Sequence, residues 1–168
     1  GYTFGGWSFN SQTYADKAEV SNLTSVKDGT VTMVAIWTPR TDTKYTVYHV
    51  VMIPKDLTTT PSSGFNPHDG DKILDEYTEI LQGTTGASVD VLKTSEVYKT
   101  GIKGYTFDEA GTAGYGKTQQ TIAADGSTEF VIYYKANKYT LTFVDENGKN
   151  PIEHTYDYAS IIRLPANT

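Results

Sequence analysis

The feature that most constrains the fold is an ordered set of segments that occurs twice along the chain. The tetrapeptide Gly-Tyr-Thr-Phe stands at residues 1–4 and again at residues 104–107. Each copy is followed by Asp-Gly and an apolar stretch that ends in an aromatic residue, and these stretches align without a gap at residues 28–37 and 125–134. The third segment of each set is Lys-Tyr-Thr with a following aliphatic residue, at residues 44–47 and 138–141. Because three segments recur in one order, we predict an array of related modules.

The amino-acid composition favours strands and tight turns over long helices. The 168 residues include 13 tyrosines and 15 glycines, and threonine and valine are also frequent. Aromatic and β-branched side chains fit a pleated, half-buried surface, and glycine serves turns. Long helical periodicity is hard to find, so the fold class that we predict is mainly β, with at most short helices.

The charge balance and the lack of cysteine exclude several kinds of partner. The net charge is −6 and the isoelectric point is about 5.0, so the surface repels phosphate backbones and we expect no nucleic-acid partner. No stretch approaches the roughly 18 apolar residues of a membrane span, so we expect no membrane insertion. A chain without cysteine has no disulfides and no thiolate metal ligands.

Residues 1–43 are interpreted as the closing half of a module. The first residues alternate as in a strand, and the glycine pair at residues 5–6 predicts a bend. A second strand is predicted over residues 30–37. Its apolar face ends in Trp37, which we expect to be buried in the core.

Residues 44–137 are interpreted as one complete module. Its predicted strands cover residues 45–53, 76–83, 105–107, 118–122 and 128–134. We expect a long loop over residues 54–75, a short helix within residues 89–99, and a glycine-rich loop that follows the third strand and reaches Gly116. Phe107 ends an alternating face, so we expect its side chain to be buried.

Residues 138–168 are interpreted as the opening of a further module. Aromatic and aliphatic residues alternate with threonine over residues 139–143, as in a half-buried strand. The sequence Asp-Glu-Asn-Gly at residues 145–148 predicts a hairpin turn, because Asn-Gly accepts positive φ at low cost. The returning strand is predicted over residues 155–162.

Segments at both ends of the chain together resemble one known repeat family. They lie at residues 139–143, 158–162, 164–165, 1–7 and 34–37. Together they resemble the Listeria–Bacteroides repeat, the internalin B-repeat type, except that Ala159 stands where that family has its usual glycine. The family order is cut in the middle here, so residues 138–168 resemble the N-terminal half of a B-repeat-like module and residues 1–43 its C-terminal half.

The central module has a likeness of its own. The segments that carry it lie at residues 45–49, 83–88, 104–107 and 121–128. They resemble the mucin-binding-protein-like (MucBP-like) repeats of bacterial surface proteins. The two resemblances imply β-grasp-like modules with mixed sheets, a tandem repeat array, and secretion to the cell surface or cell wall of a Gram-positive-type bacterium. They imply a non-enzymatic extracellular stalk or adhesin repeat.

Each half module alone leaves unpaired strand edges, which invite pairing. Two solutions are open: the halves meet within one chain, or the C-terminal half of one chain completes the N-terminal half of the next, head to tail. We therefore expect neighbouring repeats or copies of the chain as partners, with a host glycan or protein as a further partner. Leu-Pro-Ala-Asn-Thr at residues 164–168 reads as a sortase signal or, preferably, as a repeat segment.

Catalytic and metal-binding patterns are weak. The histidines are His49, His68 and His154, and none stands in an arrangement typical of nucleophilic catalysis, so we expect no enzyme and keep a hydrolase as the weakest alternative. The acidic residues Asp69, Asp71, Asp75 and Glu76 are calcium candidates. Their spacing is not that of an EF-hand, so a solvated acidic loop is preferred and no cofactor is expected.

Aromatic side chains supply the remaining candidates, because their faces stack on the apolar faces of sugars. Trp7, Tyr98 and Tyr115 are the ligand-binding candidates if they are exposed. Period-two spacing explains most other aromatic residues as core or cross-strand pairs. An exposed aromatic patch would favour the alternative function, a direct ligand-binding adhesin module for mucin glycans or a host protein.

Overall fold

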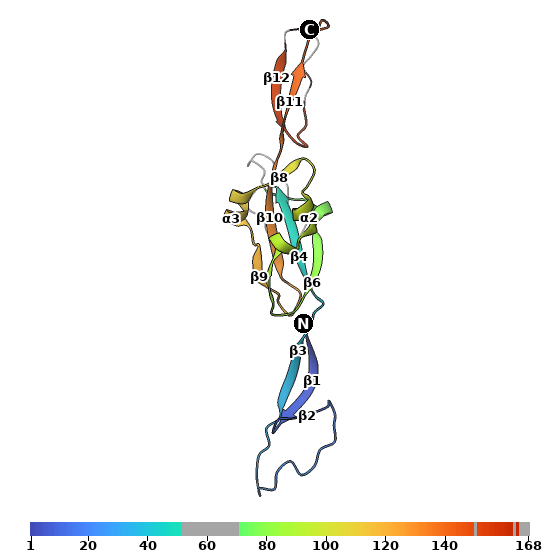
Figure 1. Cartoon of the computed structure of the whole chain (residues 1–168), viewed down its shortest axis with the longest axis vertical. Helices are drawn as coiled ribbons and strands as arrows, with labels where there is room; N and C mark the ends of the chain where they lie inside the picture. Colours follow the sequence, from blue (N-terminus) through green and yellow to red (C-terminus); the bar gives the residue numbers. More distant parts are fainter. Residues whose placement is uncertain (52–70, 150, 163, 165–168) are drawn as a thin grey trace. The chain divides into compact units, whose positions relative to one another are not determined.

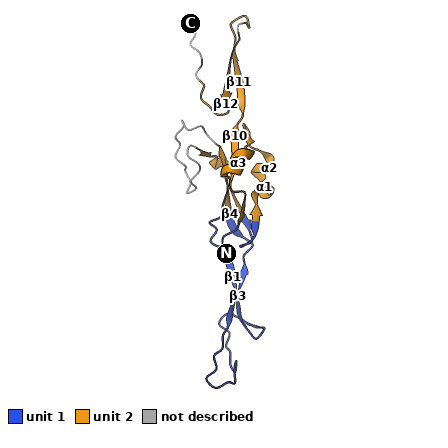
Figure 2. Ribbon diagram, turned by 90° about the vertical axis from the view of Figure 1, so that its left-hand side faces the viewer, with its two compact units in different colours: residues 1–45, 82–88, 121–128 blue, residues 46–81, 89–120, 129–168 orange. Residues whose placement is uncertain are grey.

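The structure is a computed structural model, and it describes residues 1–51, 71–149, 151–162 and 164. The fold is mainly β, with parallel and antiparallel strand pairs and only short helices, as predicted (Figure 1). The chain divides into two compact units (Figure 2). Unit 1 contains residues 1–45, 82–88 and 121–128, and unit 2 contains residues 46–81, 89–120 and 129–168. The division into modules at residues 43 and 137 stays a prediction.

Unit 1 contains a three-stranded antiparallel sheet with the order β2-β1-β3. Strand β1 (Tyr2–Phe9) turns through Asn10 and Ser11, both at positive φ, into β2 (Gln12–Tyr14). Two successive residues in the left-handed region form the hairpin turn that suits the twist of the flanking strands. Strand β3 (Val34–Pro39) pairs with the other edge of β1 and begins later than the predicted strand.

The glycine bend predicted in the first strand is a β-bulge. The register between β1 and β3 shifts between Phe4 and Gly6, and β1 continues to Phe9. Gly6 has φ +110, and a Cβ there would overlap the carbonyl oxygen of Tyr14, so glycine is required. Trp7 then packs edge-on against Phe4, with ring centroids 5.4 Å apart.

The prediction that Trp37 is buried is wrong. Its ring packs against Phe4 at 5.2 Å, yet 58% of the residue is exposed. The physical reason is the position of β3, which in the described part of the chain has a strand neighbour only on the β1 side. Alternation in the sequence identifies the apolar face but does not supply the strand that would cover it.

Unit 2 is built on a mixed sheet with the strand order β5-β4-β10-β8, and β6 also pairs with β4 (Figure 1). Strands β4 (Thr43–Val51) and β10 (Glu129–Ala136) form the parallel central pair. Strand β8 (Tyr105–Phe107) pairs antiparallel with β10, and β5 (Lys72–Ile73) pairs antiparallel with β4. Strand β6 (Glu79–Gly83) begins later than predicted and ends in unit 1.

The core of unit 2 follows from the central position of β4 and β10. Val50, Ile73, Val131 and Tyr133 form a buried cluster, with Tyr48 packed against it. Both central strands are buried along most of their length, as expected where strands have neighbours on both sides and layers on both faces.

Parallel strands need a long crossover, and helices occupy part of it. They are α1 (Val91–Thr94), α2 (Glu96–Thr100) and α3 (Glu109–Tyr115). The short helix predicted within residues 89–99 is therefore present as two helices. The glycine-rich loop predicted up to Gly116 is wrong, because α3 occupies most of it. Helix α3 packs on β10, where Tyr133 N donates to Thr112 Oγ1 at 2.9 Å.

Phe107 is half-buried, not fully buried as predicted. Its ring packs edge-on against Tyr98 at 5.0 Å and against Tyr134 at 6.4 Å. It lies on β8, the edge strand of the described sheet, so one side of the ring keeps solvent contact.

The remaining elements are short. Strands β7 (Ser88–Asp90) and β9 (Gln119–Thr121) form a two-stranded sheet, and a 3₁₀ turn, η1, covers Asp75–Tyr77. Strands β11 (Lys138–Phe143) and β12 (Ile152–Asp157) form the predicted hairpin. The return strand begins and ends earlier than predicted.

Candidate functional site

The two Gly-Tyr-Thr-Phe segments make equivalent strand pairings. Phe4 lies opposite Trp37 in unit 1, and Phe107 lies opposite Tyr134 in unit 2. Trp37 and Tyr134 are matched in the ungapped alignment of the two closing strands. In both units the Gly-Tyr-Thr-Phe segment therefore pairs with the closing strand in the same register.

The equivalence extends to the backbone hydrogen bonds beyond each strand. Arg40 N donates to Gly1 O at 2.9 Å, and Asn137 N donates to Gly104 O at 2.9 Å. We call these two places junction 1 and junction 2, and each lies within a single unit. In both, the residue three positions after the closing aromatic residue bonds to the glycine of Gly-Tyr-Thr-Phe.

A second hydrogen bond joins each junction to the turn after a later strand. Thr85 N donates to Arg40 O at 2.9 Å in junction 1, and Tyr158 N donates to Asn137 O at 2.8 Å in junction 2. The next residue has positive φ in both cases, at Gly86 and at Ala159. The position where the family resemblance expects glycine is thus left-handed here, and Ala159 adopts it at a cost in strain.

Steric contacts explain why both junctions begin with glycine. A Cβ at Gly1 would overlap Ala124, and a Cβ at Gly104 would overlap the ring of Tyr158. Gly104 also has φ +86, a conformation that side chains rarely adopt. The recurrence of the tetrapeptide therefore has a local physical cause at each copy.

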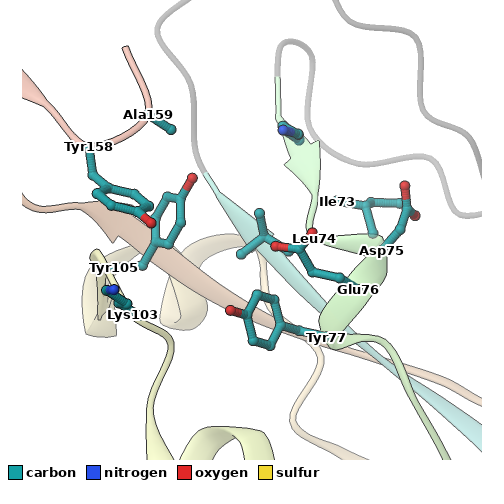
Figure 3. A pocket seen from close by; sticks show the side chains of 10 residues that line it. Ile73, Leu74, Asp75, Glu76, Tyr77, Lys103, Tyr105, Tyr158 and Ala159 are labelled. Carbon is teal, nitrogen blue, oxygen red and sulfur yellow. The ribbon is translucent and has the colours of Figure 1, made fainter.

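A pocket of about 340 Å³ lies beside junction 2 (Figure 3). Three segments of unit 2 line it, through residues 72–77, residues 103 and 105, and residues 158–159. The rings of Tyr105 and Tyr158 meet edge to face with centroids 5.2 Å apart. The volume falls at the lower end of the range for small-ligand pockets, ~300–1,000 Å³.

The chemistry of the pocket suits an uncharged polar ligand with an apolar face. Tyr105 and Tyr158 offer ring faces and edges, while Glu76 and Lys103 offer hydrogen-bonding groups of opposite charge. Burial raises the pKa of Tyr105, and Tyr158 and Glu76 raise it further, so this hydroxyl stays protonated and can donate a hydrogen bond at neutral pH.

A second polar cluster of unit 2 is enclosed in the fold. His49 is fully buried and its Nε2 lies 3.0 Å from Glu79 Oε2, while its Nδ1 lies 3.1 Å from the hydroxyl of Tyr134. Ser95 Oγ donates to Glu79 Oε2 at 2.5 Å, and the amide of Glu96 donates to Glu79 Oε1 at 3.0 Å. A carboxylate only accepts, so His49 is assigned Nε2–H and accepts from Tyr134 at Nδ1.

The ionisation of this cluster follows from its burial. Burial lowers the pKa of His49, and the hydrogen bond and charge of Glu79 offset only part of that effect. Burial alone would raise the pKa of Glu79, but hydrogen bonds from Ser95, His49 and Val97 outweigh it and lower that pKa. At neutral pH a neutral imidazole therefore donates to a carboxylate. Ser95 donates to Glu79 and not to His49, so the histidine does not activate it as a nucleophile.

The structure does not bring the predicted ligand-binding residues together. Trp7 contacts Phe4, Tyr98 contacts Phe107, and Tyr115 contacts Tyr133 at a centroid distance of 6.2 Å. None of the three predicted residues lines the pocket. Of the three, Tyr115 and Trp7 are exposed and Tyr98 is half-buried.

The acidic candidates and histidines are spread over several environments. Asp69 and His68 lie outside the described residues. Asp71 is buried, whereas Asp75 and Glu76 lie on the exposed η1 turn. Within the described ranges, no group of three or more His, Cys, Asp or Glu side chains is arranged to hold a metal ion.

Sequence reasoning missed the pocket residues Tyr77, Tyr105 and Tyr158, because three separate segments contribute them. Two of them carried a signal: Tyr105 belongs to the repeated Gly-Tyr-Thr-Phe segment, and Tyr158 belongs to a segment of the family resemblance. His154 lies on β12, with its ring 6.1 Å from that of Phe143 and 6.1 Å from that of Tyr156.

Comparison of the chain with protein-family models, with curated proteins and with solved structures finds no match. The two family resemblances therefore rest on the sequence segments alone. None of the helices in the described part of the chain has the length and apolar character needed to cross a membrane.

Proposed function

We propose that the chain is a non-enzymatic extracellular stalk or adhesin repeat of a bacterial cell-surface protein, built from small β modules in tandem. One observation carries the proposal: junctions 1 and 2 use the same strand register and the same pair of backbone hydrogen bonds. A connection made twice in one chain is what an array of repeats requires, because each module contacts only its neighbours.

The β-grasp-like fold of the modules belongs to the same proposal. In the described central region a parallel strand pair is joined by a crossover that carries short helices, and further strands pair at both sides. This arrangement supports the resemblance to MucBP-like repeats. Secretion and attachment to the cell wall follow from the resemblance alone.

The stalk proposal is tested by the dimensions of fused copies. Chains with one, two and three copies of the 168 residues are compared by small-angle X-ray scattering. A stalk lengthens by the same increment with each added copy, since neighbouring modules connect in one way. A maximum dimension that stays nearly constant as copies are added would contradict the proposal.

A direct ligand-binding adhesin module is the second candidate, and the pocket favours it. Its tyrosines and charged groups suit a glycan, in which apolar ring faces alternate with hydroxyl groups. A glycan array on the intact chain is the first test, and Tyr158→Ala is expected to reduce any signal at least about tenfold. Tyr115→Ala removes an exposed tyrosine outside the pocket and serves as the matched control. A signal that survives Tyr158→Ala excludes the pocket.

The hydrolase alternative has less support. The buried cluster around His49 holds Ser95 on the carboxylate of Glu79, and His49 itself is fully buried. A nucleophile needs a base within hydrogen-bonding reach and an open approach for the substrate. We therefore assign this cluster to the stability of the fold.

A further inference from the structure

The two ends of the repeat pattern present strands with one neighbour each. In the described part of the chain, β3 pairs only with β1 and β11 pairs only with β12. Their counterparts in the central module have more neighbours: β10 lies between β8 and β4, and β4 pairs with β5 and β6 as well as with β10. What β3 and β11 lack is a pairing equivalent to that between β10 and β4.

Burial differs accordingly at matched positions. Trp37 and Val34 on β3 are 58% and 62% exposed, whereas the matched Tyr134 and Val131 on β10 are 1% and 0% exposed. The same contrast holds between β11 and β4. Tyr139 on β11 is 52% exposed and Val144, the residue after β11, is 56% exposed, against 3% for Tyr45 and 0% for Val50 on β4. Large apolar side chains that the central pairing buries are thus left in solvent at both ends of the pattern.

We propose that β11 of one copy of this chain pairs in parallel with β3 of a second copy, in the register of β4 and β10. The inference rests on the proposed function, because it requires related modules. The proposed partner is a second copy of this chain, because β11 matches β4 in sequence and β3 matches β10, and β4 and β10 are the two strands of the central pair. The combined sheet has the order β12-β11-β3-β1, which corresponds to β6-β4-β10-β8.

The register follows from the central pair without adjustment. Thr46 lies opposite Glu129, and Tyr48 lies opposite Val131. By the sequence alignment, Thr140 then lies opposite Thr32, two residues before β3 begins, and Thr142 lies opposite Val34, the first residue of β3. Exposed apolar strand edges are association sites in general, and this register buries them on both partners.

Single cysteines test the register, because the natural chain has none. Four variants are made: Thr32→Cys, Val34→Cys, Thr140→Cys and Thr142→Cys. All four positions are exposed, so the substitutions leave the packed core intact. Neighbouring strands lie ~4.8 Å apart, within the Cα separation of a disulfide. A shift of two residues adds ~6.6 Å along the strand and prevents the bond.

The variants carry different tags and are mixed in pairs under mild oxidation. We expect Val34→Cys with Thr142→Cys, and Thr32→Cys with Thr140→Cys, to form mixed dimers at least about tenfold faster than the two crossed combinations. Circular dichroism verifies that each variant is folded. Equal rates for all four combinations, or faster crossed combinations, would overturn the proposed register.

Two further outcomes separate the alternatives. A chain that carries both Val34→Cys and Thr142→Cys forms dimers and longer linked species if copies pair head to tail, whereas an oxidised monomeric ring means that the halves close within one chain and contradicts the proposal. The mass of the natural chain is expected to rise with concentration in sedimentation equilibrium. If pairing fails while fused copies still lengthen in equal steps, this inference is wrong and the stalk proposal stands.

Discussion

At the scale of single residues, Gly104 has two independent constraints. Its φ is +86, and a Cβ would overlap the ring of Tyr158. Tyr158 also donates the second hydrogen bond of junction 2 and lines the pocket. One glycine therefore links the repeated tetrapeptide, the junction and the pocket.

Gly104→Ala is expected to lower the free energy of unfolding by about 2–3 kcal/mol, from the left-handed conformation and the displaced ring. Gly114→Ala is the matched control, since Gly114 lies in α3 and nothing lies within 4 Å of a Cβ built there. The control is expected to stabilise the chain by roughly 0.5–1 kcal/mol. Chemical denaturation measures both, and equal effects would contradict the steric argument.

The buried cluster around His49 predicts a loss of stability on acidification. The pKa of His49 is lowered from 6.5, so the unfolded chain binds more protons as the pH falls through that value, and folding becomes less favourable. The lowered pKa of Glu79 acts in the same direction as the pH falls below its ordinary value of 4.5. The thermal midpoint is expected to fall between pH 7 and pH 4.

His49→Gln is expected to flatten the part of this pH dependence that begins as the pH falls below 6.5. His154→Gln is the matched control, because it makes the same substitution at an exposed histidine on β12, outside the buried cluster. Calorimetry over the pH series measures the slope. An unchanged slope in His49→Gln would mean that His49 does not cause this pH dependence of stability.

At the scale of elements, the alternation of apolar and polar residues predicted most strands, but it did not predict what packs against them. Strands β4, β8, β10 and β11 lie within or near their predicted ranges, because their side chains alternate or run apolar as the sheet requires. Helix α3 was missed because Gly111, Gly114 and Gly116 read as a loop, and its contact with Tyr133 is a tertiary effect that local sequence does not encode.

Alternation predicted both Phe107 and Trp37 to be buried, but their burial in the structure differs. Phe107→Ala is expected to cost about 2–3 kcal/mol, because the half-buried ring packs on Tyr98 and Tyr134. Trp37→Ala is expected to cost about 1 kcal/mol or less in dilute solution, where the residue is 58% exposed. Urea unfolding measures both. A larger cost for Trp37 than for Phe107 would mean that β3 is already covered.

At the scale of the whole molecule, the order of the repeated segments was the strongest guide. It predicted related modules, which stays a prediction, and junctions 1 and 2 each contain the same two backbone hydrogen bonds. The pocket could not be predicted, because Tyr77, Tyr105 and Tyr158 meet only after three segments fold together. Neither sequence nor composition indicated that the acidic candidates would separate into buried and exposed environments.

The central claim is that consecutive modules complete one another through β11 and β3. Amide hydrogen exchange on two fused copies of the chain tests it most directly. The account predicts that β11 of the first copy and β3 of the second gain protection comparable to that of β4 and β10, while β3 of the first copy and β11 of the second exchange as in a dilute single chain. Exchange that is equal in both copies and unchanged from the single chain would contradict the account.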